Sequence, residues 1–547
     1  MSRDSISPER SGAAEPRRLI GVLPAPALGP RERLFDALEQ IHPVLFQWRE
    51  PGDLGGLDGV IVLDQSLISE VPAGLPVLLL SAPGPVVRGG ELVQFTDSTL
   101  LARPLRGRAL WEDSGRTPVS RLPAAGDTVL ASVEGRPAWW SGGPRGMTVS
   151  AFGLGELGER ETLRSHLRER RFMGVLVVLQ FLRDVCAELN WAEQPLRASF
   201  VIDDPNLHRP SYGFLHYAEL IEHAARHRHH VGLAMVPLDG HLVNRRAAAL
   251  LRANGSHVSL LAHGNDHVSR ELGRLNTSEA AERAIAQALR RLSAFQERSG
   301  IPVRRVMIPP HGACSPEAVT AMLRLGFEGA CISRPYPWRE EHDPASALDG
   351  WYPAELVAGG LPILPRYHLD HPRSDLIFRA LLRQPLILYG HHWDFAEGLQ
   401  ALSQAVSDVN DLGDVQWGPL DWIAAHNYSL RRTGELLDVR MHSLRAVVEI
   451  PAGVTAVRVH TQPIHGGPHW RGVTCAGLQA PMSRGAGGWS SEPLAVSDRQ
   501  QVEISLPPAR PLQAGALSGP VFKPWPLARR VLVEGRDRLQ PLLAARP

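Results

Sequence analysis

The middle third of the chain alternates short apolar segments with longer amphipathic ones. An apolar run of about 4–8 residues is typical of a buried parallel strand, and apolar positions three or four residues apart are typical of a helix. We expect strands over 198–202, 231–236, 258–262, 303–308, 329–332 and 386–389, and helices over 214–227, 244–254 and 277–298. This repetition predicts an α/β fold in which the strands form a closed or nearly closed (β/α) barrel.

Different patterns flank this barrel, which is expected over residues 193–432. Residues 1–17 are polar and are expected to be disordered, and residues 18–192 resemble an open α/β domain, in outline like flavodoxin or the glutamine amidotransferases. Residues 433–547 predict a small β-sandwich followed by a terminal helix over 527–543. In the first domain we expect strands over 19–24, 43–48, 59–63, 76–81 and 147–152 and helices over 31–41 and 161–188.

Charge and composition exclude several classes of function. The chain has 58 Lys and Arg against 57 Asp and Glu in 547 residues, so almost no net charge draws it to nucleic acid or an acidic membrane. It has no run of 18 uncharged apolar residues, which argues against membrane insertion. We expect a cytoplasmic protein, and the sequence leaves its oligomeric state open. The cysteines lie far apart and indicate no disulfide framework: Cys186, Cys314, Cys331 and Cys475.

Four polar clusters each follow directly after an expected barrel strand. They are Asp203-Asp204, residues 263–267, residues 309–312 and His391-His392. Because the active sites of βα barrels are built at the carboxyl ends of the strands, we expect these clusters to meet at one face.

One carboxylate and two imidazoles in these clusters suit a catalytic metal. His263 and His267 are four residues apart, which on a helical turn puts both on one side, and Asp204 would complete a set that leaves positions open for water and substrate. The histidine pair alone is weak evidence, and a lone Asp-Asp dipeptide more often marks a solvated turn. Adjacent residues on an extended strand point opposite ways, so Asp203 would stay free to accept a proton.

The same clusters resemble, in order, the motifs of the polysaccharide deacetylase family. Residues 200–206 (Phe-Val-Ile-Asp-Asp-Pro-Asn) are similar to its Asp-Asp motif, and residues 263–267 to its His-x-x-x-His motif. Residues 308–312 (Ile-Pro-Pro-His-Gly) are similar to the proline-containing third motif, and residues 386–391 to the final strand that ends in histidine. The resemblance covers about residues 195–430, which is less than half of the chain.

This resemblance implies a metal-dependent hydrolase in which Asp203 is the general base and His391 the general acid. The backbone around Pro310 and His311 would help to hold the oxyanion. Zinc is the first expectation for the metal, with Co, Ni, Mn or Fe as alternatives, and the substrate would be a carbohydrate or an acetylated small molecule. The implied ligands of the divalent metal are Asp204, His263 and His267.

The sequence departs from the motifs of the family at two positions. Members of the family usually carry Arg just before the prolines of the third motif, where this chain has Ile308, so the residue that orients Asp203 is not identified. His391 is followed at once by His392, and the strand register decides which of them faces the site. Other residues after the strands either line the substrate cleft or are ordinary loop residues. They are Asn206, His208, Tyr212, Asp239, His241, His392, Trp393 and Asp394.

Some further patterns are not expected to carry chemistry. Residues 153–158 satisfy Gly-x-Gly-x-x-Gly, but they end the first domain and no ribose-binding strand and acid follow. Cys186 lies within an expected helix rather than at a strand-to-helix turn. Two sets of histidines are expected to be polar surface residues: His223 with His227, and His460 with His465 and His469.

Three functions follow from these observations. The leading hypothesis is a deacetylase that acts on an N-acetylated sugar or polysaccharide through metal-activated water, and so hydrolyses carbon–nitrogen bonds other than peptide bonds. The second is hydrolysis of an amide that is not a sugar acetamide. The third is a catalytically degenerate barrel that binds carbohydrate or a protein partner, suggested by the missing Arg and the two flanking domains.

Overall fold

The computed structural model describes residues 16–24, 30–119, 121–142, 146–192, 194–333, 346–464, 472–485, 488–496, 500–507, 510–519 and 524–544. Most of the expected disordered start, residues 1–15, lies outside these ranges, as do His465 and His469. The chain forms two compact units, one of residues 1–101, 107–159 and 169–190 and one of residues 102–106, 160–168 and 191–547. The expected boundaries of three domains stay predictions.

The first unit is built on a nine-stranded sheet in the order β2-β1-β3-β4-β9-β8-β7-β5-β6. Its parallel strands were predicted: β1 (Arg18–Leu23), β2 (Val44–Trp48), β3 (Gly59–Val62), β4 (Val77–Leu80) and β9 (Met147–Ser150). Its antiparallel strands were not: β5 (Val86–Phe95), β6 (Ala109–Ser114), β7 (Thr128–Val133) and β8 (Arg136–Gly142). Gly89 and Gly90 interrupt β5 and Pro137 lies in β8, so these segments are loop-like in sequence.

The helices of this unit are α1 (Pro30–Ile41) and α3 (Met173–Val185). The single helix expected over 161–188 is therefore wrong. The segment forms two helices, and the shorter one, α2 (Leu163–Arg168), belongs to the second unit.

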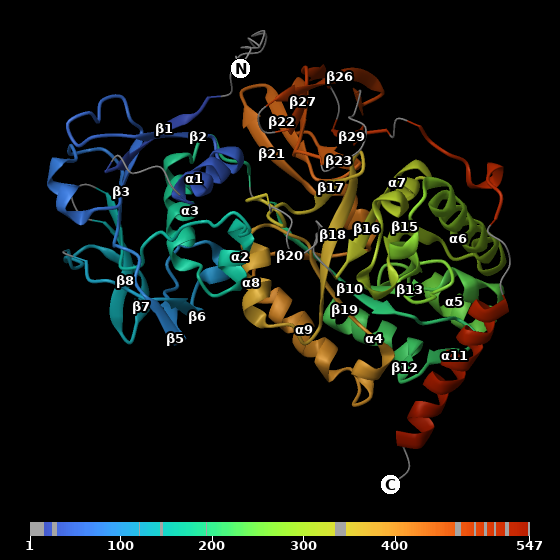
Figure 1. Cartoon of the computed structure of the whole chain (residues 1–547). Coiled ribbons are helices and arrows are strands. Elements are labelled where there is room, and N and C mark those ends of the chain that lie inside the picture. The colour runs from blue at the N-terminus through green and yellow to red at the C-terminus, as the bar shows by residue number, and fades with distance from the viewer. Residues whose placement is uncertain are drawn as a thin grey trace. The chain divides into compact units, whose positions relative to one another are not determined.

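The second unit contains a closed barrel of seven parallel strands (Figure 1). Around the barrel these are β10 (Leu196–Asp203), β13 (Val231–Met235), β14 (Val258–His263), β15 (Val303–Ile308), β16 (Gly329–Ile332), β18 (Leu361–His368) and β19 (Leu386–Gly390). The predicted barrel is confirmed. Strand β18 was not predicted because it contains Pro362 and Pro365, and proline cannot donate to a strand ladder.

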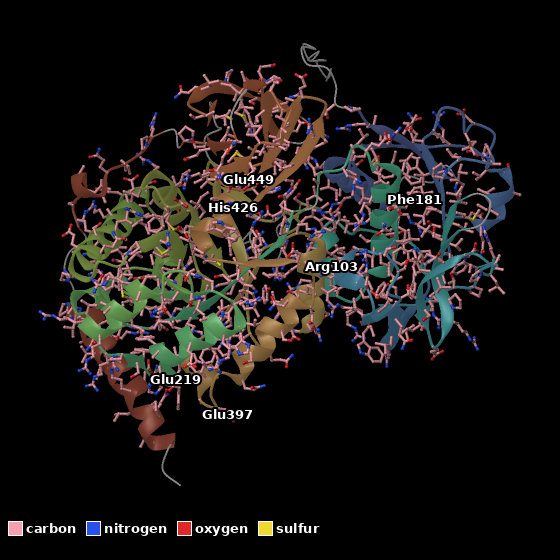
Figure 2. All side chains as sticks on the ribbon, turned by 180° about the vertical axis from the view of Figure 1, so that it is seen from behind. Arg103, Phe181, Glu219, Glu397, His426 and Glu449 are labelled. Carbon is pink, nitrogen blue, oxygen red and sulfur yellow. The ribbon has the colours of Figure 1, made fainter. Side chains whose placement is uncertain are left out.

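Helices and short strands surround this ring. The helices are α4 (Tyr217–His227), α5 (Arg245–Ala253), α6 (Ser278–Ser299), α7 (Pro316–Arg324), α8 (Arg373–Leu381), α9 (Gln400–Asn410) and α10 (Leu420–Ala425). The short strands are β11 (Ser211–Tyr212), β12 (Leu215–His216), β17 (Glu355–Val357) and β20 (Val415–Trp417). Figure 2, the view from behind, labels Glu219 on α4 and His426 at the end of α10.

Apolar side chains fill the barrel, and polar residues follow them on the same strand faces. Val201, Leu261, Leu364 and Ile387 belong to one buried core. Because side chains alternate along a strand, the residues two positions later point the same way. Those residues are Asp203, His263, Arg366 and Tyr389. The carboxyl end of the barrel therefore carries a set of polar groups directly above the core.

The last part of the second unit is a β-sandwich that ends in a long helix (Figure 1). The strands enclose one apolar core that includes Val439, Val459, Val473 and Ile504. They are β21 (Tyr428–Thr433), β22 (Leu436–Met441), β23 (Arg445–Glu449), β24 (Ala456–Thr461), β25 (Gly472–Cys475), β26 (Leu478–Gly485), β27 (Gly488–Ser491), β28 (Leu494–Ala495) and β29 (Gln501–Ser505). The final helix is α11 (Pro524–Ala544), and no described helix of the chain is long and apolar enough to cross a membrane.

Candidate active site

The two carboxylates at the end of β10 diverge. Asp203 is still part of the strand, whereas Asp204 has a φ of +70°, in the left-handed region, so the chain turns sharply there. His267 and His311 also have positive φ, at +54° and +57°. Aspartate tolerates this region better than most residues, and backbone strain of this kind concentrates at functional sites.

Asp204, His263 and His267 converge on one point. The Oδ1 atom of Asp204 lies 3.2 Å from His267 Nε2 and 3.7 Å from His263 Nε2. Ligands bound to one zinc ion at about 2.0–2.2 Å can be at most about 4.4 Å apart, and both distances are within that limit. The structure therefore brings together the three residues that the sequence proposed as ligands.

The surroundings of these groups fit a bound cation. Among the residues that the structure describes, Asp204 Oδ1 is buried and has no hydrogen-bond partner. His263 Nδ1 lies 2.9 Å from the carbonyl oxygen of Ile308, so it can donate there and leave the Nε2 lone pair toward Asp204. Burial lowers the pKa of His267 to about 3, although Asp204 opposes the shift, so this imidazole is in the neutral form that binds metals.

Asp203 is held by an arginine that the sequence did not identify. Arg366, on β18, donates from Nη1 and Nη2 to the two oxygens of Asp203 at 2.7 and 2.8 Å, and each residue is 3% exposed. Burial opposes ionisation, but the charge of Arg366 holds the pKa of Asp203 well below its usual range. Position 308 holds isoleucine and cannot pair with Asp203, so the arginine that pairs with Asp203 comes instead from strand β18. The sequence signal that could have found it is Arg366 two residues after the apolar Leu364, but the prolines of this segment argued against a strand there.

His391 follows β19 and borders the same site. In the described part of the chain its Nδ1 atom is buried without a hydrogen-bond partner, and its backbone N–H donates to Asp394 Oδ2 at 2.7 Å. The ring stacks on Trp393 with 4.3 Å between centroids and 9° between planes. Burial lowers the pKa of His391, while Asp203 and Asp204 act in the opposite direction.

His392 is placed in a different environment from His391. It is 1% exposed, stacks on Phe214, and its Nε2 lies 3.6 Å from Asp537 Oδ2. The carboxylates of Asp203 and Asp204 act on His391, whose ring therefore borders the candidate site. The substrate-binding role expected for His392 gains no support from these contacts.

The predicted oxyanion region follows β15. Pro310 is buried, and His311 is exposed with its ring centroid 5.3 Å from that of His267. Partial desolvation of the His311 ring lowers its pKa, and Asp204 opposes this shift. The role of this backbone in holding an oxyanion stays a prediction.

Most of the expected cleft residues contact α11, which the sequence did not connect with the site. Asn206 Oδ1 accepts from Arg538, His208 lies 2.8 Å from Glu534, Tyr212 donates to Asp537, and Asp239 accepts from Arg530. His241 lies near the carbonyl of Leu238 and Asp394 bonds His368 and His391. Trp393 is 45% exposed and presents an open indole surface.

The residues that the sequence discounted have structural contacts, with two corrections. His223 is not a surface residue: it is 7% exposed and lies between His229, at 2.9 Å, and Ser403, at 2.8 Å. His460 is not a surface residue either: it is 8% exposed and lies 2.9 Å from Asp438, so an acid is also close by. Cys186 is buried, and burial raises the pKa of its thiol to about 11. A Cβ on Gly153 would lie 2.4 Å from the backbone of Pro83, so close packing requires glycine there.

No family profile and no curated protein matches the sequence. Among solved structures, the chain is similar to Agd3, described as a novel carbohydrate deacetylase, with 11% identity, 90% of this chain and 98% of that chain covered, and a TM-score of 0.47. It is also similar to a family 4 carbohydrate esterase from Streptomyces lividans, with 12% identity, 42% of this chain and 94% of that chain covered, and a TM-score of 0.25. A CE4 esterase from Streptococcus mutans is similar at 14% identity, with 41% of this chain and 86% of that chain covered and a TM-score of 0.26. These proteins are of the class that the motifs resemble. Every TM-score is below 0.5, so function is argued from the geometry of the site.

The contact between His368 and Asp394 predicts a contribution to stability that depends on pH. His368 Nε2 lies 3.2 Å from Asp394 Oδ2, and this hydrogen bond, with another to Asp370, raises the pKa of His368 to about 9. Because the folded pKa exceeds the ordinary 6.5, the contact stabilises the fold fully below pH 6.5 and loses its effect as the pH rises to 9. We expect the stability difference between wild type and His368→Gln to shrink across that window.

Urea unfolding at several pH values measures this difference, and His216→Gln, at an exposed histidine on β12, is the control. A difference that stays constant from about pH 6 to 9.5 would contradict the raised pKa.

Proposed function

We propose that this chain is a metal-dependent hydrolase that removes the acetyl group from an N-acetylated sugar or polysaccharide. The observation that supports this best is the convergence of Asp204, His263 and His267 next to Asp203, whose charge is fixed by Arg366. A carboxylate and two neutral imidazoles with room for further ligands are the donor set of a catalytic metal site.

The residues of the chain divide the chemistry of amide hydrolysis between them. A divalent ion bound by the three ligands would supply Lewis-acid chemistry, which lowers the pKa of coordinated water and polarises the carbonyl oxygen. Asp203 has about four lone-pair sites, of which Arg366 occupies two, so it can still take the proton of the attacking water. The water oxygen bonds to the acetyl carbon as its proton passes to Asp203, the carbon–nitrogen bond breaks, and His391 in its protonated form gives the leaving amine a proton.

The surface next to His391 favours a sugar over other amides. Trp393 stacks on the His391 ring and is 45% exposed, so an apolar ring edge borders the reacting groups. Small-molecule sites combine aromatic surface with a few placed polar groups, and a saccharide offers both an apolar ring face and hydroxyl groups to match them. The degenerate-barrel hypothesis loses its main support, because Arg366 supplies the arginine that the third motif lacks.

The decisive experiment measures bound metal and acetate release on the same protein. We expect purified wild type to release acetate from N-acetylated oligosaccharides and to lose this activity with a chelator. In Asp204→Ala, zinc affinity should fall by more than the roughly 10–100-fold that loss of an outer partner costs, because a ligand is removed, and acetate release should fall with it.

Asp266→Ala, which changes a neighbouring carboxylate that pairs with Arg291, is the matched control and should keep the metal. An undiminished rate in Asp204→Ala would end the proposal. Amide turnover without acetate as a product would select the alternative of an amide hydrolase with another substrate.

A further inference from the structure

Helix α11 has its polar face buried and its apolar face exposed. Arg530 and Asp537 are 3% and 2% exposed, whereas Val531, Leu532 and Leu539 are 63%, 67% and 55% exposed. A surface helix ordinarily buries its apolar stripe. Charged and polar contacts, rather than burial of apolar surface, therefore fix α11 (Figure 1) to the barrel unit, for example where Arg538 donates to the carbonyl oxygen of Ser211 on β11.

The first turns of α11 contact the loops that carry the proposed metal ligands. Arg530 donates from Nε to both oxygens of Asp239 at 3.1 Å, its Nη2 lies 3.5 Å from the carbonyl oxygen of Asp204, and its Nη1 lies 3.6 Å from Asp204 Oδ1. Arg529 donates to the carbonyl oxygen of His267 at 2.5 Å. Two neighbouring arginines thus hold the chain at two of the three ligands.

The following turns attach the helix to the loop after β10. Asp537 accepts from Tyr212 Oη at 2.7 Å and lies 3.6 Å from His392 Nε2, and Glu534 lies 2.8 Å from His208 Nδ1. These acids are largely buried, so the contacts form in a setting where water competes weakly. The helix is fixed along several turns rather than at one point.

We infer that α11 is a structural wall of the active site and that Arg530 is a positioning residue, which ties Asp204 to Asp239 and so holds Asp204 in its ligand geometry. Asp204 has a positive φ, a conformation that persists only when its surroundings impose it. The fork of Arg530 is already committed to Asp239, so Arg530 acts through these carboxylates and not on a substrate. That Arg530 contributes to catalysis through Asp204 rests on the proposed function.

Arg530→Lys tests this inference because it keeps the positive charge and removes the planar fork. We expect the zinc affinity of the purified full chain, measured by calorimetric titration with Zn²⁺ alone, to fall about tenfold or more, as for loss of an outer-shell partner. Arg226→Lys, at a 66% exposed arginine on α4, is the matched control and should bind Zn²⁺ as wild type does. A purely structural role would lower the melting temperature of Arg530→Lys and leave the affinity of the folded protein unchanged, which would overturn the inference.

Asp239→Asn provides a second variant if Arg530→Lys does not fold. It releases Arg530 and leaves its charge uncompensated 3.6 Å from Asp204, so it should also weaken Zn²⁺ binding at least tenfold. Wild-type affinity in Asp239→Asn would overturn the inference. Because these titrations use no substrate, a wild type that binds Zn²⁺ but releases no acetate would contradict the proposed function alone.

Discussion

Replacing Asp203 by Asn should lower kcat for acetate release by about 10³-fold, in the middle of the range for loss of a general base or acid. Asparagine has nearly the same shape but cannot accept the proton of the attacking water. Zinc binding should persist, because Asp203 is not one of the three converging ligands. Steady-state kinetics together with a zinc titration on the same sample measure both effects.

The same substitution also leaves Arg366 buried without its partner acid, so a folding defect has to be separated from lost chemistry. The double variant Asp203→Asn with Arg366→Met removes both charges of the buried pair, and such replacements are often neutral for stability. We expect the double variant to recover most of the stability while its rate stays low. Recovery of the rate as well would mean that Asp203 is structural and not a base.

Arg366→Met alone should reduce the free energy of unfolding by about 3–5 kcal/mol, because it leaves the charge of Asp203 buried and unpaired. Wild-type Asp203 has a folded pKa below its ordinary 3.8, so the pair stabilises the protein above that pH and loses its effect only as the pH falls through the folded pKa. Without Arg366, burial acts nearly unopposed and raises the pKa of Asp203 above 3.8. The variant should therefore become less stable, relative to wild type, as the pH rises above about 4.

Chemical unfolding at several pH values measures this trend, and a second buried pair provides the control. Arg379 bonds Asp375 on α8, and both are under 10% exposed. Arg379→Met should cost comparable stability without a direct loss of acetate release. If Arg366→Met were as stable as wild type at pH 7, the proposed importance of the fork to Asp203 would be incorrect.

The sequence determined the barrel and its polar end because both depend on local patterns. Runs such as 198–202 and 386–389 are largely apolar on both faces, as buried parallel strands are, and each polar cluster follows a run directly. The alternation of side chains then puts Asp203 and His263 above the barrel core without knowledge of distant parts of the chain. These features allowed a candidate metal site to be predicted from patterns that are local to each segment.

The tertiary structure alone decided which distant residues complete that site. Arg366 reaches Asp203 across 163 positions of sequence, from a strand whose two prolines conceal it, and Arg530 reaches Asp239 across 291 positions from the last helix. Whether His391 or His392 faces the carboxylates depends on strand register and on Asp537, again on α11. Periodicity and motif spacing describe neighbours along the chain, whereas these contacts exist only because folding closes the barrel and fixes the final helix against it.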